Sequence, residues 1–203
     1  YGQKSLFSER KFSKECSKNI GSEFIEINLN WLAKISNSLI NKNGEYKKLN
    51  LSDLKKSEKE SEKFYVPCRN IIFLVHAMAL AESLSIKNEI DYNIFIGFKN
   101  DGKESYPDTT SEFVKEMNKL SKISCSTKIN IFAPLIKKDK EDIILLGKNL
   151  GVDFRKTFTC YIEKKEHCGT CLACRLRQEG FYWSNLKDPT KYQEKTKDYR
   201  SAR

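Results

Sequence analysis

The sequence predicts an α/β fold with a parallel sheet, followed by a small metal-binding region. Expected strands and helices alternate along most of the chain. The strands are short continuous apolar runs, which are typical of a parallel sheet covered on both faces. Beyond residue 156 the alternation stops and a cluster of cysteines follows. We therefore expect an α/β domain over residues 1–156 and a metal-binding C-terminal region over residues 157–203.

The N-terminal third contains one expected helix, one expected strand and a polar stretch. The helix covers residues 9–19 and ends near Gly21. The apolar run FIEINL at residues 24–29 is expected to be a strand. Residues 41–63 are polar with mixed charges, which favours a mobile loop, or alternatively a lid over a site.

A helix is predicted over residues 69–84, directly after Pro67. Its apolar residues lie nearly all round the helix, so we expect it to be buried on every side. His76 lies within it, and a hydrogen-bonded core histidine is a better interpretation than a ligand or a base.

The remaining elements continue the alternation. Strands are expected over residues 92–98 and 129–135, with a helix over residues 111–121 between them. Asp139 can cap a further helix, which we expect to close at Gly151.

The composition indicates a globular chain with anionic partners. Hydrophobic residues make up 39% of its 203 residues, and the formal net charge is +10. A positive balance favours nucleotides, phosphates or nucleic acid as partners. No apolar run reaches the roughly 18 residues needed to span a membrane, so we expect a soluble, cytoplasmic protein without a membrane partner.

Four of the seven cysteines lie close together near the C-terminus. Three follow the pattern C-x2-C-x2-C, and the fourth lies a short loop upstream. Four thiolates at this spacing can surround one tetrahedral Zn²⁺ at Zn–S distances of about 2.3 Å. No coordination position would remain for water, so such a site is structural rather than catalytic. The expected ligands are Cys160, Cys168, Cys171 and Cys174.

Other interpretations of these cysteines stay open. Two disulfides would suit a secreted protein, but the chain shows no signal peptide and is rich in lysine. An iron–sulfur cluster is a second alternative, although ferredoxin spacing continues with a downstream cysteine rather than an upstream one. Unliganded buried thiols are a third, and His167 in place of one cysteine ligand is a fourth.

Residues suited to a nucleotide or a base follow the expected strands or begin the expected helices. Arg69 and Asn70 begin a helix, where free N–H groups and the helix dipole attract phosphate. Asp101 and Asp108 lie in a loop at the carboxyl end of a strand, where ligands of parallel sheets bind. A carboxylate there can accept N–H donors from a guanine-like base, or it can simply cap a turn. Lys140 can reach a phosphate, although alone it would be a surface lysine.

Seven segments occur in the same order as in one known family and span nearly the whole chain. They are YGQKSLFSE, YVPCRN, SYPDTTSEF, APLIKKDKED, TCYI, HCGTCLACRLRQEGF and DPTKY. On these segments the chain resembles the 7-cyano-7-deazaguanine synthase family of the queuosine and archaeosine precursor pathway. The cysteine block is the most specific of them.

The resemblance implies an ATP-pyrophosphatase-like fold, that is, a Rossmann-like parallel sheet of the adenine-nucleotide alpha-hydrolase type with a small zinc-binding appendage. It implies an ATP-dependent ligase that converts 7-carboxy-7-deazaguanine and ammonia to the nitrile through adenylated intermediates. One Zn²⁺ per protomer, ATP with Mg²⁺ and a homodimer are further implications. The site residues expected on this basis are Arg69 and Lys140 for catalysis and ATP, Asp108, Asp101, Asn70 and Phe113 for the substrate, and the four named cysteines for zinc.

Two departures from the family pattern affect these expectations. The phosphate loop of the form SGGxDS is not in this sequence, so we expect these 203 residues alone to bind ATP poorly. About 30–40 further residues before Tyr1 would supply one strand–loop–helix–strand unit. Cys68 stands where glycine is usual, which is compatible with the turn if its φ is negative.

Two rival functions follow from the same sequence. One is a relative that keeps the fold but adenylates another acid or a protein. The other is a zinc-stabilised nucleic-acid-binding module, which the net charge and the basic tail KYQEKTKDYRSAR favour. No recognition-helix pattern or alternation of aromatic and basic residues supports this second rival.

Overall fold

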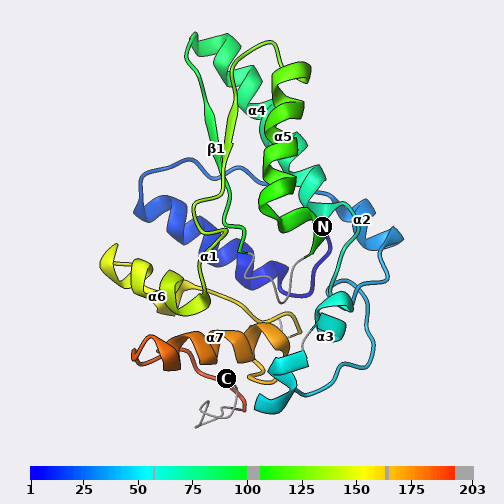
Figure 1. Ribbon diagram of the computed structural model, residues 1–203, viewed down its shortest axis with the longest axis vertical. Coiled ribbons are helices and arrows are strands. Elements are labelled where there is room, and N and C mark those ends of the chain that lie inside the picture. Colours follow the sequence, from blue (N-terminus) through cyan, green and yellow to red (C-terminus); the bar gives the residue numbers. More distant parts are fainter. Residues whose placement is uncertain (57, 100–105, 163–164, 195–203) are drawn as a thin grey trace. The chain divides into compact units, whose positions relative to one another are not determined.

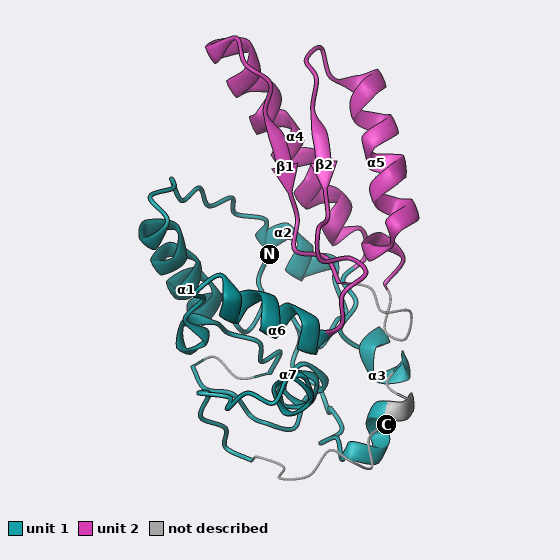
Figure 2. Ribbon diagram, turned by 60° about the vertical axis from the view of Figure 1, so that its left-hand side comes forward, with its two compact units in different colours: residues 1–66, 140–203 teal, residues 67–139 magenta. Residues whose placement is uncertain are grey.

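The computed structural model describes residues 1–56, 58–99, 106–162 and 165–194. The chain divides into two compact units, which Figure 2 colours separately. Unit 1 comprises residues 1–66 and 140–203, and unit 2 comprises residues 67–139. This division does not fall at residue 156, and the predicted domain boundary there stays a prediction.

Unit 2 is an α/β layer built on a parallel strand pair. β1 (Asn93–Phe95) pairs in parallel with β2 (Asn130–Phe132), with Ile94 opposite Ile131. α4 (Arg69–Asn88) contacts β1, and α5 (Ser111–Ser124) contacts β2 (Figures 1 and 2). The buried core of this layer consists of Leu74, Met78, Met117 and Ile131. The predicted α/β class with a parallel sheet is confirmed, with shorter strands than expected.

The other face of the strand pair is not covered within the described residues. Phe95 and Phe132 stack there with ring centroids 5.2 Å apart, and they are 71% and 44% exposed. α4 likewise buries only one face. Its exposed apolar residues are Phe73, Val75, Leu80 and Ile86. The expectations of a sheet covered on both faces and of a helix buried on every side are therefore wrong here, because each element is covered only where another packs against it.

Glycines end two helices as the sequence predicted. α1 (Leu6–Asn19) is followed by Gly21 with φ +68°, and the Ser22 N–H donates to the Ser17 carbonyl at 2.9 Å. α6 (Lys140–Asn149) is followed by Gly151 with φ +73°, and the Val152 N–H donates to the Gly147 carbonyl at 2.8 Å. These six-to-one hydrogen bonds are Schellman motifs, which require the left-handed conformation that glycine adopts freely.

The predicted strand at residues 24–29 is wrong. This segment forms neither strand nor helix, and α2 (Asn30–Ile35) begins directly after it. Ile25 and Ile27 are about half exposed. An apolar run becomes a strand only where another strand accepts its backbone hydrogen bonds, and the described residues supply none to this segment.

The interpretation of residues 41–63 as a loop or lid is also wrong in part. The stretch contains the 3-10 helix η1 (Leu51–Lys56) and α3 (Glu58–Glu62). Leu49 and Leu54 are buried against Leu172, and the Leu49 N–H donates to the Thr170 carbonyl at 2.9 Å. A few leucines within a charged sequence are enough to bury one side of the segment, although its average composition is that of a loop.

The C-terminal region contains a helix that the sequence analysis did not place. α7 (Leu172–Trp183) packs against α6, and η3 (Phe154–Lys156) precedes the cysteines. Gly180 allows the close approach of the two helices, because a Cβ built there would lie 2.7 Å from the Cβ of Lys140. α7 begins within the cysteine motif, since Cys171 is its N-cap and Cys174 lies in its first turn.

α4 is, within the described residues, the one helix whose length and composition would allow it to cross a membrane. The sequence analysis expected no apolar run long enough to span a membrane, and α4 differs from that expectation. The core helix of a globular protein passes the same test, and α4 buries Asn70 and Ser85 together with Leu74 and Met78. The helix is therefore no evidence for a membrane partner.

Candidate functional site

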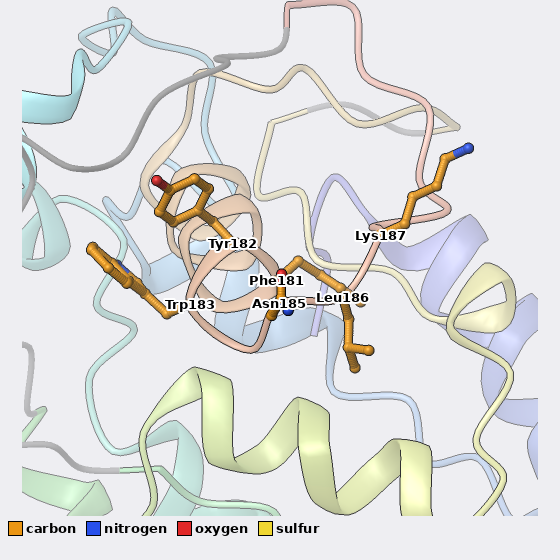
Figure 3. Close-up of a pocket in the computed structure, with 6 residues that line it drawn as sticks. All are labelled: Phe181, Tyr182, Trp183, Asn185, Leu186 and Lys187. Atoms are coloured by element: carbon orange, nitrogen blue, oxygen red, sulfur yellow. The ribbon is translucent and has the colours of Figure 1, made fainter.

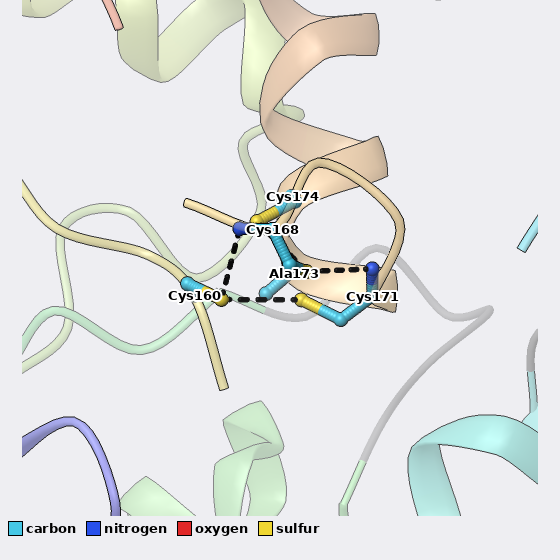
Figure 4. Close-up of a cluster of buried hydrophobic side chains, with 5 residues drawn as sticks. All are labelled: Cys160, Cys168, Cys171, Ala173 and Cys174. Carbon is cyan, nitrogen blue, oxygen red and sulfur yellow. Dashed lines mark hydrogen bonds between the residues drawn. The ribbon is translucent and has the colours of Figure 1, made fainter. Parts of the chain in front are cut away.

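The four predicted cysteine ligands converge in unit 1 (Figure 4). Cys160 comes from the segment after η3, Cys168 from the next turn, and Cys171 and Cys174 from the N-cap and first turn of α7. Their side chains are at most 3% exposed. A short stretch of chain therefore folds back on itself and places four sulfur atoms in one buried cluster.

The sulfur–sulfur distances match those around a single ion. The Cys160 and Cys171 Sγ atoms are 4.0 Å apart, and those of Cys168 and Cys174 are 3.9 Å apart. All four Sγ atoms lie within 4.8 Å of one another. A tetrahedral ion with metal–sulfur bonds of about 2.3 Å places its ligands about 3.8 Å apart. A disulfide needs about 2.05 Å, so the two-disulfide alternative does not describe this arrangement. The group can hold one metal ion.

Backbone N–H groups support the sulfur atoms. The Cys171 N–H donates to the Cys168 Sγ at 3.3 Å, and the Thr170 N–H donates to the same atom at 3.4 Å. The Cys168 N–H donates to the Cys160 Sγ at 3.5 Å. Such donors stabilise thiolates, the form that binds a metal, and fix the direction in which the sulfur atoms point.

The thiols perturb one another strongly. Hydrogen bonding with Cys160, Cys171 and Cys174 holds the pKa of Cys168 far below its ordinary value. Hydrogen bonding to the other thiols, together with burial, raises the pKa of Cys174 far above it. Four buried thiolates together need a cation to neutralise their charge.

His167 is not arranged as a ligand in this structure. Its Nε2 accepts a hydrogen bond from the Thr159 N–H at 3.1 Å, and its ring lies between those of Phe158 and Tyr192. Burial, with a smaller contribution from the nearby Arg177, lowers the pKa of His167 to about 4. A neutral imidazole that already accepts a hydrogen bond fits the surroundings, so the four thiols form the better ligand set.

Two supporting residues were not singled out from the sequence. Thr170 is 2% exposed, and its hydroxyl lies 3.7 Å from the Cys168 Sγ. Gln178 is 3% exposed, and its Nε2 donates to the Gly169 carbonyl at 2.9 Å. Gln178 follows Cys174 by four residues, so helical spacing was the signal that could have found it.

In unit 2 the structure brings Asn70 and Asp108 together, although 38 residues separate them. The Asn70 N–H donates to Asp108 Oδ2 at 3.2 Å, and the Asn70 Nδ2 donates to the Asp108 carbonyl at 3.3 Å. Each of these two residues is only 4% exposed. Asp108 lies in the 3-10 helix η2 (Pro107–Thr109), and its carboxylate caps the N-terminus of α4.

The second carboxylate oxygen of Asp108 has no such role. Oδ1 is buried and has no hydrogen-bond partner within the described part of the chain. A buried carboxylate oxygen without a donor is costly, so this atom is suited to receive an N–H group from a ligand. Of the two alternatives that the sequence left open, the structure shows Asp108 as a capping residue, and its role as an acceptor for a base stays a prediction.

The other predicted site residues are placed as follows. Arg69 lies beside the Asn70–Asp108 pair, and its Nε donates to Asn70 Oδ1 at 3.3 Å. The ring of Phe113 packs against Phe98 in the core of unit 2, with centroids 6.2 Å apart. Lys140 begins α6 in unit 1, so it is not placed relative to Arg69. Asp101 lies outside the described residues.

The backbone beside Arg69 differs from the expected conformation. Cys68 has φ +56° and lies at the N-cap of α4 in the left-handed region. The condition of a negative φ, under which Cys68 would suit the turn, is therefore not met. The left-handed backbone conformation costs a residue with a Cβ about 1–2 kcal/mol of conformational free energy. The tight turn into α4 keeps Cys68 in this conformation.

A surface hollow at the end of α7 does not coincide with either group of residues. It is lined by Phe181, Tyr182, Trp183, Asn185, Leu186 and Lys187 (Figure 3). The labelled side chains of Trp183 and Lys187 point away from each other. None of the predicted site residues lines it, so it is not the candidate site.

Comparison with known proteins identifies the family. The family model described as "Queuosine biosynthesis protein QueC" matches residues 1–185. A 7-cyano-7-deazaguanine synthase of Methanobrevibacter smithii is 34% identical over 197 residues, covering 96% of this chain and 85% of that protein. The enzyme of the same name from Methanothermobacter thermautotrophicus is 29% identical over 195 residues, covering 96% and 86%.

A further relative covers a shorter region at higher identity. The 7-cyano-7-deazaguanine synthase of Rickettsia akari is 41% identical over 135 residues, which is 63% of this chain and 57% of that protein. The family match includes both the Asn70–Asp108 pair and the four cysteines. With the parallel α/β unit and the thiol cluster in place, the chain belongs to the queuosine biosynthesis protein QueC family.

Proposed function

We propose that this protein is an ATP-dependent carbon–nitrogen ligase that converts 7-carboxy-7-deazaguanine and ammonia to 7-cyano-7-deazaguanine. The family match over residues 1–185 is the observation that carries the proposal. Relatives named 7-cyano-7-deazaguanine synthase align over nearly the whole chain, which favours this function over adenylation of another acid or nucleic-acid binding.

In this reaction each of the two carboxyl oxygens of the substrate is adenylated in turn and leaves as part of AMP. ATP activates the carboxylate and releases pyrophosphate, and ammonia displaces AMP to give the amide. A second ATP activates the amide oxygen, and loss of AMP with a proton leaves the nitrile. Exclusion of water protects both activated species from hydrolysis.

Asp108 is the residue that we assign to the deazaguanine base. Its buried Oδ1 without a described partner supports this assignment, because a carboxylate can accept N–H donors from the edge of a guanine-like base. Asn70 fixes the carboxylate through its N–H group, and the side-chain amide holds the Asp108 backbone. Asp101 and Phe113 stay predictions as substrate-binding residues.

Arg69 and Lys140 are assigned to the phosphates of ATP, which binds with Mg²⁺. The N-terminus of α4 already carries the Asp108 carboxylate, so we expect the Arg69 guanidinium, rather than the helix N–H groups, to contact phosphate. Mg²⁺ would neutralise phosphate charge and orient the leaving pyrophosphate. The assignment of Lys140 depends on its charge and on the family resemblance.

Zn²⁺ is the metal that we propose for the four thiols. Complete burial, four cysteine ligands and sulfur separations near 3.9–4.0 Å support a closed structural site. Metal analysis of the purified protein tests this proposal. One zinc per chain is the expected result, whereas a stably folded metal-free protein or an iron chromophore would contradict it.

The protein is also proposed to act as a homodimer in the cytoplasm. The family resemblance supports the dimer, and the lysine-rich composition supports the compartment. Sedimentation equilibrium at several protein concentrations tests the oligomeric state. A single species of monomer mass would contradict the dimer without affecting the proposed reaction.

Nitrile formation by the purified full-length protein tests the function. The reaction contains ATP, Mg²⁺, ammonium and the deazaguanine acid, and mass spectrometry detects the product. Asp108→Asn should keep the fold while reducing turnover by a factor on the order of 10² or more, because a mispaired base edge is costly in a buried site. Asp91→Asn, which changes an exposed carboxylate of the same unit, is the matched control.

Three outcomes would change the proposal. Absence of nitrile with adenylation of a different acid would favour the repurposed relative. Binding to RNA or DNA without any adenylation would favour the nucleic-acid module. Normal turnover by Asp108→Asn would show that another residue contacts the base.

A further inference from the structure

The C-terminal segment Asp188–Glu194 is attached to the cysteine site by a buried ion pair. Asp188 Oδ1 lies 3.6 Å from Arg177 Nε, and these side chains are only 3% and 8% exposed. Arg177 lies on α7 one turn beyond Cys174, and it donates to Thr157 Oγ1 at 2.7 Å and to the Phe154 carbonyl at 3.1 Å. One guanidinium thus connects α7, the chain before Cys160 and the C-terminal segment.

Asp188 also organises the segment that follows it. The Thr190 N–H donates to Asp188 Oδ1 at 3.0 Å, and the Tyr192 hydroxyl donates to Asp188 Oδ2 at 2.5 Å. The ring of Tyr192 lies edge-on to that of His167, with centroids 5.5 Å apart, and packs against the cysteine cluster. Both carboxylate oxygens are therefore used to close a turn over the site.

The backbone then pairs with the turn that carries Cys168. Tyr192 and His167 form a parallel bridge, and the Gln193 N–H donates to the His167 carbonyl at 3.0 Å. The Glu194 N–H donates to the Cys168 carbonyl at 3.1 Å. The segment thus lies directly on the backbone of one proposed metal ligand.

Gly169 makes this approach possible. Its φ is +84°, and a Cβ built on it would lie 1.6 Å from the Glu194 carbonyl oxygen. No side chain, not even a methyl group, fits in that space while the segment is docked. The glycine next to Cys168 is therefore required by the contact with Glu194 as well as by its own turn.

We propose that Asp188–Glu194 is a strap that closes the thiol site and slows the loss of its metal ion. Arg177, Asp188 and Tyr192 are positioning residues, since none of them supplies a ligand and each acts through the backbone of residues 167–169. The proposal depends on the metal site proposed above. It assigns a role to the DPTKY segment that is separate from binding of ATP or of the base.

A buried ion pair suits a strap that must dock in one register. Such a pair adds little net stability compared with apolar packing, but removing one partner leaves an uncompensated buried charge. Displaced registers of the strap would separate Asp188 from Arg177. The pair therefore disfavours partly closed states in which the Cys168 turn would be free to move.

Metal release to an excess of a chromophoric chelator tests the proposal. Zinc-loaded wild-type protein is compared with Tyr192→Phe and Asp188→Asn, each of which keeps the size of the side chain. We expect release at least about tenfold faster in both variants, because each loses a charge-assisted hydrogen bond that holds the strap. Tyr92→Phe and Asp91→Asn, which change side chains of unit 2, are the controls and should release zinc at the wild-type rate.

Two further readouts separate a strap from a general loss of structure. Cobalt-substituted variants should keep the absorption spectrum of a tetrathiolate site, because all four ligands are intact. Amide hydrogen exchange at Gln193 and Glu194 should accelerate in Tyr192→Phe, while exchange in α4 is unchanged. Gly169→Ala should also accelerate exchange at Gln193 and Glu194, because its Cβ would clash with the Glu194 carbonyl.

The possible failures are distinguishable. A wild-type protein that binds no metal overturns the metal site and the strap together. If the wild-type protein binds one metal ion but Tyr192→Phe and Asp188→Asn release it within twofold of the wild-type rate, only the strap is overturned. A changed cobalt spectrum in Tyr192→Phe would also overturn it, by showing that the ligand arrangement itself depends on Tyr192.

Discussion

The two groups of candidate residues differ in how the chain brings them together. The sulfur cluster of unit 1 comes from one stretch of chain, Cys160 to Cys174, whose turn and first helical turn place all four thiols. The Asn70–Asp108 pair of unit 2 joins a helix N-terminus to a loop 38 residues away. A local site can form once its own turn forms, whereas the second site exists only when the whole unit is folded.

The strongest test of this comparison is loss of one thiol. Cys171→Ser should abolish stoichiometric metal binding and destabilise unit 1 by several kcal/mol, because binding of a structural metal contributes directly to the free energy of folding. Metal analysis and thermal unfolding measure the two effects. Unit 2 should keep its slow-exchanging amides in α4.

The matched controls are cysteines outside the cluster. Cys16 is exposed and Cys125 is half-buried, and neither belongs to the four-thiol group. Cys16→Ser and Cys125→Ser should bind one metal ion per chain as the unchanged protein does. Equal destabilisation by all three substitutions would show that the cluster has no special role in folding.

Loss of the Asp108 carboxylate should have a smaller effect, confined to unit 2. Asp108→Ala removes the acceptor for the Asn70 N–H at the start of α4 and should cost about 0.5–2 kcal/mol. Chemical denaturation measures this change, and metal content should not change. Asp108→Asn can still accept the hydrogen bond, so a cost as large as that of Asp108→Ala would contradict the capping role.

The strained residue at the start of α4 offers a stabilising change. Cys68→Gly should stabilise the protein by about 0.5–1 kcal/mol, because glycine adopts φ +56° without the penalty of a Cβ but loses more backbone entropy on folding. Cys68→Ala retains the Cβ and should give no such gain. Denaturation midpoints of the two variants decide whether the backbone or the thiol is responsible.

The smallest expected effect is a pH dependence within unit 2. Hydrogen bonds from the Ser126 N–H at 2.6 Å and from its hydroxyl at 2.8 Å lower the pKa of Glu82 below 4.5. A lowered pKa in the folded state gives stability that is present above pH about 4.5 and is lost as the pH falls through the folded value. Glu82→Gln should remove this part of the acid sensitivity.

The matched variant for this small effect changes a donor instead of the acceptor. Ser126→Ala removes one of the two hydrogen bonds to Glu82 and should reduce the acid sensitivity in part. The stability–pH curves are measured by denaturation at several pH values from about 3 to about 7, an interval that includes the titration of carboxylates. Identical acid sensitivity of Glu82→Gln and the unchanged protein would contradict the role of the Ser126 hydrogen bonds.

Features that depend on neighbouring residues were predictable from the sequence by itself. The four cysteines, the helix ends at Gly21 and Gly151 and the alternation of strand and helix in unit 2 all follow from local spacing or local backbone geometry. The parallel pairing of β1 and β2 was also predictable from the sequence, because two neighbouring strands joined by a crossover helix run in the same direction.

Features that depend on distant partners were decided only by the tertiary structure. The run at residues 24–29 lacks a described strand to pair with, and the polar stretch at residues 41–63 packs through Leu49 and Leu54 against α7. Asp108 became a helix cap, with one buried oxygen that no described residue contacts, only when its loop met α4. Burial and hydrogen bonding depend on which surfaces come into contact. The local sequence does not indicate that two residues 38 positions apart will form such a contact.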